Sequence, residues 1–521
     1  MYLAVIAVGL VSLYLIRLLH RPAAPLPPGP KGLPLLGNIR DLPDTNSPDW
    51  LHWLKHKDLY GPISTLTVLG QRLIILNDAQ AAFEILEKKS IVSSNRPSLP
   101  FARLCGIEDT ILMQPYGKQL KSYRTYVHHE IGSSSSAARF NRAQSIEVRR
   151  FLLRLLDAPQ HLRRHAHGLA GAFILRVLYG YQIDYTREDP LLCYIEETLE
   201  VLTAAVVPGT WLVDSIPALK HVPAWFPGAG FQRTAQHLRA KLQFLLDLPF
   251  AFVKDQVHLG NNEPSYVSNL LRDKGISPGS NEESEVKWTA VSLYFGGADT
   301  TVSTISSFFL AMVLYPDVQR QAQEEIDRVI GRGRLPDHAD RVHLPYINAV
   351  VKEALRWHPV VPMGVAHSMM EDDIYDGYLI PKGSIIMPNI WGFCHDPKDY
   401  RDPMDFQPER FLGDSPERDP SFVFGYGRRI CPGRVVADSS VYLAVVTSLA
   451  AFNIGKKIRD GEELKVETHF LPGMVSHPAP FEMDIALRDP KYGDLVQSVE
   501  SEHPWEENDA KIVHEMLGSQ R

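Results

Sequence analysis

The sequence predicts a mainly α-helical protein with small β sheets, preceded by a single N-terminal transmembrane helix. Runs of helical period dominate its 521 residues, only two short stretches are typical of strands, and the amino-terminal stretch is apolar without interruption. With 45% hydrophobic and 22% charged residues, the composition excludes a disordered or collagen-like chain. The formal net charge of −7 provides no general attraction to nucleic acid, so we expect no nucleic-acid partner. The four cysteines lie tens of residues apart, which excludes a disulfide framework and a structural zinc site.

The amino-terminal segment predicts a membrane anchor over residues 1–21. Residues 2–16 carry no charge, and the apolar run continues past Arg17 to Leu19, so that a helix of about 18 residues would be roughly 27 Å long. That length is just enough to cross a bilayer. Basic residues follow the span, which by the positive-inside rule leaves the rest of the chain in the cytosol. A cleaved signal peptide is the alternative, but it would begin with basic residues and end at a small-residue cleavage site.

Proline is enriched, with 39 residues in 521, and its placement predicts the domain organisation. Six prolines lie within residues 22–36, which we therefore expect to form a stiff, extended hinge rather than a helix. The remaining residues, 37–521, contain no repeat or second linker, and we expect them to form one large unit. Seven further prolines lie between positions 359 and 408, where we expect a long irregular segment of fixed path.

Within that unit, hydrophobic periodicity and stop signals define the main elements. A long helix is expected at 284–314, because acidic residues stand at its start and a proline follows its end. Its strongly apolar character indicates that it runs through the centre of the domain. Helices are also expected at 317–330, as a solvent-exposed surface helix, and at 346–357. Strand-like runs occupy 63–76 and 374–388, the second with turn residues inside it.

The strongest chemical signal is the run FGYGRRICPG at residues 424–433. Three glycines around Cys431, closed by a proline, predict a tight loop whose backbone approaches a ligand closely. Such a loop would present the Cys431 thiolate, with backbone amides bonding the sulfur and Arg429 available to an anionic group. A plain glycine-rich turn around a buried cysteine is the alternative. A dinucleotide-binding loop is excluded, because Ile430 stands where a third glycine would be required.

Two further patterns indicate a function only when they occur together with the cysteine loop. Glu353 and Arg356 lie three residues apart on one helical face, and a buried pair of this kind needs a further partner such as Arg410. By itself, the pattern is far more often a surface ion pair. Gly296 and Gly297 in the long helix cost about 1 kcal/mol each relative to alanine, and close approach of a ligand to the backbone is one reason for them. A kink in that helix is the alternative.

Together these patterns resemble the signatures of the cytochrome P-450 superfamily. The haem-binding signature F-x-x-G-x-R-x-C-x-G is matched at Phe424, Gly427, Arg429, Cys431 and Gly433. The ExxR pair with its third member is matched at Glu353, Arg356 and Arg410, and the oxygen-activation segment at 296–301. The resemblance covers nearly the whole chain and implies the cytochrome P-450 fold, with 37–521 as a haem-thiolate catalytic domain.

The resemblance also implies how a cofactor is held. It implies one haem b whose iron has the Cys431 thiolate as its axial ligand. Arg429 and Arg124 would bind the haem propionates. His367 would be a further propionate ligand, and an ordinary loop histidine with its hydrogen bonds satisfied is the alternative for that residue. The family commonly has a tryptophan four residues before the arginine that corresponds to Arg124, and this chain has Leu120 there. That replacement removes one hydrogen-bond donor from the expected haem site.

The activity that the resemblance implies is a monooxygenase reaction, in which O2 is used to hydroxylate or otherwise oxidise a lipophilic small molecule. Asp299 and Thr300 would be the catalytic residues, because they would relay protons to bound oxygen. Electrons would come from an NADPH-cytochrome P-450 reductase, with cytochrome b5 as a candidate second donor. The candidate docking face for the reductase comprises Lys118, Lys121, Arg428 and Arg434. The implied location is the endoplasmic reticulum membrane, with a single span and a cytosolic catalytic domain.

By family position, the candidate residues of the substrate pocket are mostly apolar, which implies a lipophilic substrate. They are Phe101, Leu104, Tyr294, Phe295, Val361, Met363, Val365, Met474 and Val475. The run at 355–383 is similar to that of filamentous-fungal enzymes of secondary metabolism. We therefore expect a terpenoid or polyketide intermediate as the substrate.

Two other functions stay open at this point. A haem-thiolate isomerase or dehydratase would need neither O2 nor a reductase. A non-catalytic haem sensor would need no reductase-docking face. Proteins of the isomerase kind tend to lack the acid and alcohol that Asp299 and Thr300 provide, and a sensor has no use for them.

A group of histidines at 161–167 has the spacing of a metal site. His161 and His165 lie four residues apart, and His167 follows. Because two arginines lie between them, an exposed basic helix face is the simpler interpretation.

Overall fold

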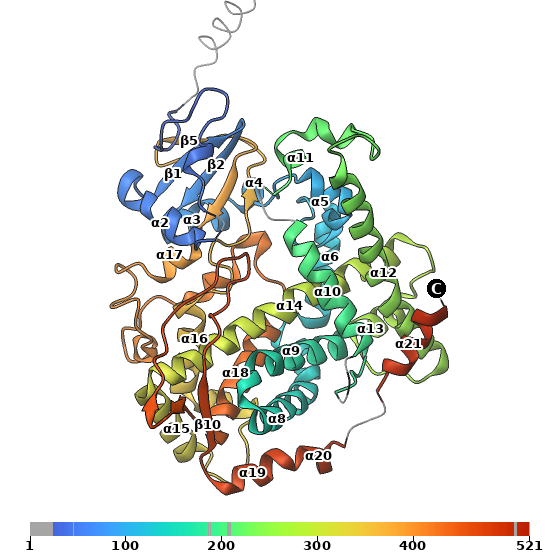
Figure 1. Ribbon diagram of the computed structural model, residues 1–521, viewed down its shortest axis with the longest axis vertical. Helices are drawn as coiled ribbons and strands as arrows, with labels where there is room; N and C mark the ends of the chain where they lie inside the picture. The colour runs from blue at the N-terminus through green and yellow to red at the C-terminus, as the bar shows by residue number, and fades with distance from the viewer. Residues whose placement is uncertain are drawn as a thin grey trace, which may run out of the picture.

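The computed structural model describes residues 24–44, 46–185, 187, 189–205, 210–504 and 508–519, drawn as the coloured ribbon in Figure 1. The anchor predicted at 1–21 lies outside the described residues. Two described helices, α14 (Asn281–Leu314) and α18 (Arg434–Ala451), are long and apolar enough to span a membrane. In their most apolar stretches 78% and 67% of the residues are buried inside the fold, so both are core helices.

Helices dominate the described residues, which confirms the mainly α-helical part of the predicted fold class. Before α14 they are α2 (Asp49–Tyr60), α3 (Ala79–Ala82), α4 (Ser90–Ser93), α5 (Pro100–Cys105), α6 (Lys118–Ile131), α7 (Ser134–Ala137), α8 (Asn141–Asp157), α9 (Leu162–Tyr179), α10 (Pro190–Ala205), α11 (Leu212–Ser215), α12 (Gly230–Leu259) and α13 (Tyr266–Lys274). After α14 they are α15 (Pro316–Val329), α16 (Pro345–Trp357), α17 (Ile390–Cys394), α18, α19 (Pro490–Gln497), α20 (Val499–Glu502) and α21 (Ala510–Ser519).

The β structure is small, and its main sheet lies at the upper left of Figure 1 beside α2, α3 and α17. The strand order of this sheet is β1 (Ile63–Val68), β2 (Gln71–Leu76), β6 (Ile385–Pro388), β3 (His367–Ser368). Three two-stranded sheets pair β4 (Asp373–Tyr375) with β5 (Tyr378–Ile380), β7 (Phe452–Lys456) with β10 (Met483–Leu487), and β8 (Ile458–Arg459) with β9 (Glu462–Glu463). The pairing of β2 with β6 is parallel and joins chain segments about 300 residues apart.

The stretch expected to hold strands at 63–76 is a β-hairpin. Its two strands pair antiparallel, with Ile63 opposite Leu76 and Val68 opposite Gln71. The two residues between them, Leu69 and Gly70, both have positive φ, at 49° and 84°. This is the two-residue turn whose twist matches that of antiparallel strands.

The central helix is α14, and it begins slightly earlier than expected because Ser280 caps it. The Ser280 hydroxyl accepts a hydrogen bond from the backbone N–H of Glu283 at 3.2 Å. From Thr301 to Val313 every residue is buried, so other helices must surround this half of α14. They include α9, α16 and α18. The helices expected at 317–330 and 346–357 are α15 and α16, each with a proline at its first turn.

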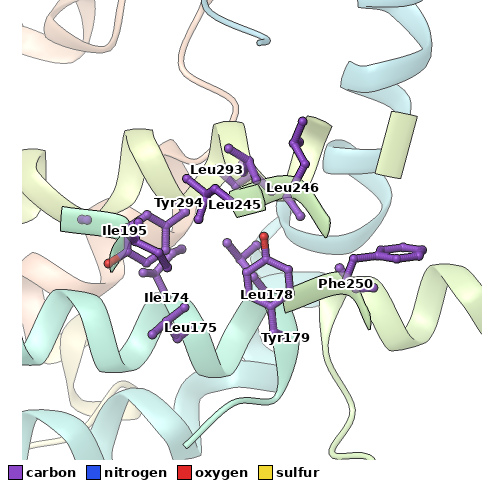
Figure 2. Close-up of a cluster of buried hydrophobic side chains, with 14 of the residues drawn as sticks. Ile174, Leu175, Leu178, Tyr179, Ile195, Leu245, Leu246, Phe250, Leu293 and Tyr294 are labelled. Atoms are coloured by element: carbon purple, nitrogen blue, oxygen red, sulfur yellow. The ribbon is translucent and has the colours of Figure 1, made fainter. Parts of the chain in front are cut away.

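A large apolar cluster joins α14 to α9, α10 and α12, and Figure 2 shows part of it. Its labelled members are Ile174, Leu175, Leu178 and Tyr179 of α9, Ile195 of α10, Leu245, Leu246 and Phe250 of α12, and Leu293 and Tyr294 of α14. The carboxy-terminal helix α21 packs against α10 and α12 and adds the fully buried Val513 to this cluster. The end of the chain therefore belongs to the same core as the central helix.

The described part of the proline-rich hinge is bound to the sheet corner. Because proline has no N–H, the hinge contributes carbonyl oxygens: the N–H of Leu379 donates to Pro25 at 2.7 Å, and that of Thr65 donates to Pro28 at 2.9 Å. Gly29 makes this approach possible, since a Cβ there would lie 1.9 Å from the Thr65 carbonyl oxygen. This part of the expected hinge is thus docked on the body of the protein.

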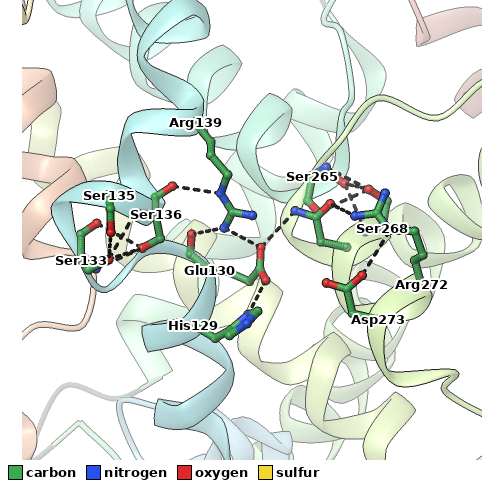
Figure 3. Close-up of polar contacts among 11 residues, drawn as sticks. His129, Glu130, Ser133, Ser135, Ser136, Arg139, Ser265, Ser268, Arg272 and Asp273 are labelled. Atoms are coloured by element: carbon green, nitrogen blue, oxygen red, sulfur yellow. Dashed lines mark hydrogen bonds and ion pairs between the residues drawn. The ribbon is translucent and has the colours of Figure 1, made fainter.

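Buried Glu130 fixes the end of α6, the helix that carries Arg124 (Figure 3). Its carboxylate accepts hydrogen bonds from Arg139 Nη2 and Asn269 Nδ2, both at 3.0 Å, and lies 2.7 Å from His129 Nδ1. Arg139 also donates to the Glu130 backbone carbonyl at 2.8 Å. A buried carboxylate with this many partners holds α6 in one position against α13.

Candidate functional site

The cysteine loop leads the chain into α18. The N–H of Cys431 donates to the Phe424 carbonyl at 2.7 Å, which closes the loop. Gly427 has a φ of 51°, and a Cβ at that position would lie 2.6 Å from Ser90 Cβ. Its N–H also donates to the Glu87 carboxylate. Both backbone conformation and space therefore require glycine at 427.

Cys431 is half-buried, and opposing effects act on its thiol. Burial raises the pKa of Cys431, whereas hydrogen bonds from the backbone of Gly433 and Arg434 and the charges of Arg124 and Arg434 act to lower it. No described atom would lie within 4 Å of a Cβ at Gly433, so the space beside the loop is open. The loop can present its sulfur to a ligand in that space.

Open space also lies beside the middle of α14. Gly296 is the one exposed residue between positions 286 and 314 of that helix, and a Cβ on it would have no described atom within 4 Å. Gly297 differs, because its Cβ would lie 3.0 Å from Ile174 Cδ1 of α9. The sequence analysis expected a ligand to approach the backbone closely at both glycines. The open space makes this possible at Gly296, whereas Gly297 allows the close packing of α9 on α14.

Three arginines gather near the cysteine loop, and none has a carboxylate partner among the described residues. Arg124 Nη1 donates to the Ile430 carbonyl at 2.9 Å, and Arg429 Nε donates to that of Ser94 at 2.7 Å. Burial lowers the pKa of Arg429 to about 10, and the charge of Arg124 adds to this effect. The third is Arg96, whose pKa is lowered by burial and by the charge of Arg429. Buried cations need a counter-charge, so this cluster fits the two propionates of the implied haem.

Sequence reasoning missed Arg96, because no spacing pattern marks it. Its guanidinium donates to the carbonyl oxygens of Leu112, Val365 and Ala366 at 2.7 to 2.9 Å. Only the burial of the side chain in the folded structure distinguishes it from a surface arginine.

His367, the third expected propionate ligand, lies beside this cluster. Its Nδ1 is 2.8 Å from the Ser93 carbonyl oxygen, and burial, with the charges of Arg96 and Arg429, lowers its pKa to about 3. The neutral ring that donates from Nδ1 offers only a lone pair at Nε2. Binding of a propionate by His367 therefore requires the doubly protonated ring, which the charge of the anion favours.

A fully buried ion cluster joins Glu353 and Arg356 of α16 to Arg410. Arg356 Nε and Nη2 each donate to the Glu353 carboxylate at 2.7 Å, and Arg410 Nε donates to it at 3.2 Å. Arg356 Nη1 donates to the carbonyl oxygens of Cys394 and Pro403 at 2.9 and 2.8 Å. The cluster thereby fixes the path of the proline-rich segment that leads to the cysteine loop.

Asp299 and Thr300 are adjacent in α14, but their side chains have different partners. Thr300 Oγ1 donates to the Gly296 carbonyl at 2.6 Å, next to the open space. Asp299 Oδ2 lies 3.1 Å from His477 Nε2, and Oδ1 lies 3.9 Å from His167 Nε2. Burial by itself raises the pKa of Asp299, but the hydrogen bond from His477 and the charge of His167 lower it overall. The Asp299 carboxyl group is therefore ionised at neutral pH.

The prediction that the histidines at 161–167 form an exposed face is wrong for two of the three. His161 is exposed, but His165 is buried with Nε2 2.8 Å from the Ala158 carbonyl oxygen. His167 is half-buried and faces Asp299. The helical spacing alone did not show that α14 covers the His167 side of α9.

The residues expected to line a substrate pocket fall into two groups. Leu104, Phe295, Val361, Val365, Met474 and Val475 are partly exposed, whereas Phe101, Tyr294 and Met363 are buried. The Phe101 ring stacks on Trp211 with centroids 3.7 Å apart. Tyr294 lies in the cluster of Figure 2, and its hydroxyl would be 3.7 Å from a Cβ at Gly171 of α9. Tyr294 therefore takes part in the packing between α9 and α14.

The four basic residues expected to form a docking face are all exposed: Lys118, Lys121, Arg428 and Arg434. Two of them flank Tyr116, with Lys121 Nζ 5.3 Å and Arg428 Cζ 5.7 Å from the ring centroid. The residues come from α6 and from both sides of Cys431, and the contacts with Tyr116 bring Lys121 and Arg428 together near the cysteine loop.

Comparison with known proteins gives consistent matches over this region. The family model described as cytochrome P-450 matches residues 27–485, which include every site residue described above. The chain is 46% identical to the cytochrome P-450 monooxygenase ppsD of Aspergillus oryzae, over 94% of each chain. It is 44% identical to the multifunctional cytochrome P-450 monooxygenase af510 of Aspergillus fumigatus, over 94% of this chain and 93% of the relative. It is 42% identical to O-methylsterigmatocystin oxidoreductase of Aspergillus flavus, over 99% and 98%.

Proposed function

The chain belongs to the cytochrome P-450 family of haem-thiolate enzymes, and on this premise we propose that it oxidises a lipophilic intermediate of fungal secondary metabolism, a terpenoid or a polyketide, with O2 and electrons from an NADPH-dependent reductase. The observation that carries the proposal is the pairing of the Cys431 loop with two buried arginines, Arg96 and Arg429, and the half-buried Arg124, none of which has a carboxylate partner among the described residues. This residue set fits an iron porphyrin with two propionates.

In this proposal each part of the haem has its own partners in the chain. Cys431 would supply a thiolate ligand to the iron, and hydrogen bonds from the backbone of Gly433 and Arg434 would stabilise the sulfur. Arg124, Arg429 and Arg96 would neutralise the propionates, with His367 as a further partner. Leu120 is buried in the position where a tryptophan donor is usual, so these arginines carry the binding that the tryptophan would add.

When bound, the haem iron supplies O2 activation, and overall one oxygen atom enters a C–H bond while the other leaves as water, with two electrons and two protons consumed. The chain must deliver those protons in order. Thr300 stands beside the open space at Gly296, where its hydroxyl can pass a proton by exchanging its bond to the Gly296 carbonyl. Asp299, the neighbouring residue, would return a proton to Thr300 after its carboxylate has itself taken one up.

The electron donor we propose is a membrane-bound NADPH-cytochrome P-450 reductase, with cytochrome b5 as a candidate second donor. The basic surface around Tyr116 supports this, because an acidic partner docked there would lie close to the Cys431 loop. Because this docking would depend on exposed charged side chains, the affinity for the reductase should fall as the salt concentration rises.

The substrate class rests on two observations. The partly exposed pocket residues are apolar, which favours a lipophilic molecule. The names of two relatives include monooxygenase, and the third acts on O-methylsterigmatocystin by name.

We propose that residues 1–21 anchor the chain in the endoplasmic reticulum membrane, that 22–36 form the hinge, and that 37–521 form the cytosolic catalytic domain.

The test is spectroscopic and chemical. The reduced, carbon-monoxide-bound protein is expected to show the red-shifted Soret band of thiolate ligation. Cys431→Ala should abolish the band, while Cys193→Ala, which removes an exposed cysteine, should leave it unchanged. Product must then form from pathway intermediates only with O2, NADPH and the reductase. Conversion that continues without O2 would instead identify an isomerase or dehydratase, and a thiolate band without any conversion would favour a sensor.

A further inference from the structure

Asp299 is held by a residue that lies far from it in the sequence. His477, on the loop after β9, places Nε2 3.1 Å from Asp299 Oδ2. We propose that His477 is the positioning residue of the proton relay: it holds the Asp299 carboxylate toward His167, from which Asp299 takes the proton that it hands to Thr300. This inference deepens the proposed function and rests on it.

The loop that carries His477 is itself fixed to two helices. Ser303 of α14 donates its hydroxyl to the Ser476 carbonyl at 2.5 Å. The Ser476 hydroxyl lies 2.8 Å from His358 Nε2, just past the end of α16, and the Ser476 N–H donates to the Val360 carbonyl at 2.9 Å. The position of His477 is therefore set by the same helix that carries Asp299, so the two side chains meet with little freedom to separate.

The hydrogen bonding of His477 favours one protonation state. Its side chain is 8% exposed, and Nδ1 is buried without a partner among the described residues. A hydrogen on Nδ1 would be buried without an acceptor, so of the two neutral tautomers the one with its hydrogen on Nε2 is the less costly. In that tautomer His477 donates to Asp299. It positions the carboxylate rather than supplying the proton.

His167 has the properties of the proton donor. Its side chain is 29% exposed, which lets it exchange protons with solvent, and its Nε2 faces the free oxygen, Asp299 Oδ1, at 3.9 Å. That distance exceeds a hydrogen bond, so one water or a small rotation closes it. The doubly protonated His167 gives its Nε2 proton to Oδ1, becomes neutral and takes its next proton from solvent. No oxidant or reductant enters this step.

The charged groups around this carboxylate come from three elements. His167 and Arg163 lie on α9, Glu196 lies on α10, and His477 lies on the loop that follows β9. Burial raises the pKa of Glu196, and the charge of Asp299 raises it further. Burial lowers the pKa of His167, opposed by the charge of Asp299. Proton delivery by His167 should therefore weaken as pH rises through the range in which the ring loses its charge.

The experiment compares two replacements of His477 in the haem-loaded, full-length protein. The side-chain amide N–H of glutamine can reach the position that Nε2 occupies in histidine, whereas leucine has no hydrogen-bond donor. With the reductase, NADPH and a substrate of the enzyme, His477→Leu should lower product per NADPH about tenfold, with the lost electrons appearing as peroxide. His477→Gln should stay within about twofold of the natural protein. His165→Gln, which alters a buried histidine that bonds Ala158 instead, is the matched control.

A second readout does not depend on turnover. If His477 and Asp299 interact, the losses of melting temperature in His477→Leu and Asp299→Asn should not add in the double variant. His167→Leu should also flatten the pH dependence of coupling. The inference would be overturned by any of three results. The melting shifts could be additive, leucine and glutamine at position 477 could uncouple equally, or His477→Leu could form as much product per NADPH as the natural protein. Absence of the thiolate band in the natural protein would overturn the proposed function instead.

Discussion

Glu353 and Arg356, three residues apart in α16, are joined by two hydrogen bonds of 2.7 Å with both side chains fully buried. The pair is completed by Arg410 and by backbone carbonyls of the segment between α17 and the cysteine loop. It connects one of the core helices to the irregular chain that must present Cys431. The stability of this connection and the binding of haem should therefore change together.

Replacement of the central carboxylate should disconnect that segment. Glu353→Gln leaves the guanidinium group of Arg356 buried without its counter-charge, while Arg410 keeps its ion pair with Glu417 at 2.5 Å, and the loss is expected to cost about 3–5 kcal/mol of the free energy of unfolding. Thermal unfolding and haem content per protein measure the two effects. Glu84→Gln, which breaks the exposed pair with Lys88, is the control and should change neither. A Glu353→Gln protein with unaltered melting and haem content would contradict the assigned role.

Gly427→Ala should destabilise the cysteine loop through both conformation and contact. A left-handed alanine costs about 1–2 kcal/mol, and its Cβ would meet Ser90 at 2.6 Å. Gly377 separates the two effects, since its φ is 77° but no described atom lies within 4 Å of a Cβ there. Gly377→Ala should show the conformational cost alone and keep its haem. Equal melting temperatures for the two variants would show that the contact with Ser90 is relieved without cost.

Thr300→Val should uncouple electron use from oxidation, because it removes the hydroxyl beside the open space at Gly296. Product per NADPH should fall and peroxide should rise by about tenfold or more, while the thiolate band is retained. Thr301 makes the same kind of bond, to the Gly297 carbonyl at 3.1 Å, but is 8% exposed. Thr301→Val is thus the control, and uncoupling of the same size in both variants would argue against a specific relay through Thr300.

The docking of α21 should depend on pH through Asp509. Its N–H donates to the Gln182 carbonyl at 3.0 Å and its carboxylate accepts from the Gln182 N–H at 2.8 Å, while burial raises its pKa to about 6. Because the folded pKa lies above the unfolded value near 3.8, the neutral form stabilises the contact, and this stability is lost as pH rises toward and through about 6. Hydrogen exchange in α21, corrected for its intrinsic pH dependence, should be faster at pH 7.5 than at pH 5.

Two variants test that assignment. Asp509→Asn keeps an acceptor for the Gln182 N–H but cannot ionise, so exchange in α21 should lose its pH dependence. Asp494→Asn, at an exposed position of α19, should retain it. A pH dependence that survives Asp509→Asn would place the titrating group elsewhere.

Truncation should separate the anchor from the docked hinge. Deletion of residues 1–21 should leave a folded haem protein with much weaker membrane association, measured by sedimentation with membranes. Deletion of residues 1–30 removes the carbonyls of Pro25 and Pro28, so the N–H groups of Leu379 and Thr65 lose their acceptors. The second truncation should therefore melt at a lower temperature than the first. Equal melting would mean that the hinge adds nothing to the stability of the sheet corner.

Much of the fold and of the site could be predicted because it depends on short-range patterns. The spacing of Glu353 and Arg356, the glycines around Cys431 and the turn residues of the strands act within a few positions of the chain. The helices predicted at 284–314, 317–330 and 346–357 appear with nearly these bounds, since periodicity and prolines act locally too. Contacts between distant segments leave no such pattern. The sequence did not show that Tyr294 lies beside Gly171 of α9, and the exposed face predicted for His167 is wrong, because that side chain is half-buried beside Asp299 of α14.

By itself, the sequence determined that this protein is mainly helical, that it carries the haem-thiolate signature, and which residues form the ExxR cluster. Only the tertiary structure decided that Arg96 is buried with Arg429 near Arg124, and that His477 meets Asp299. The physical reason is that a residue's charge state and partners depend on burial and on the packing of remote segments. These are properties of the folded chain as a whole, whereas periodicity and motif spacing belong to a few neighbouring residues.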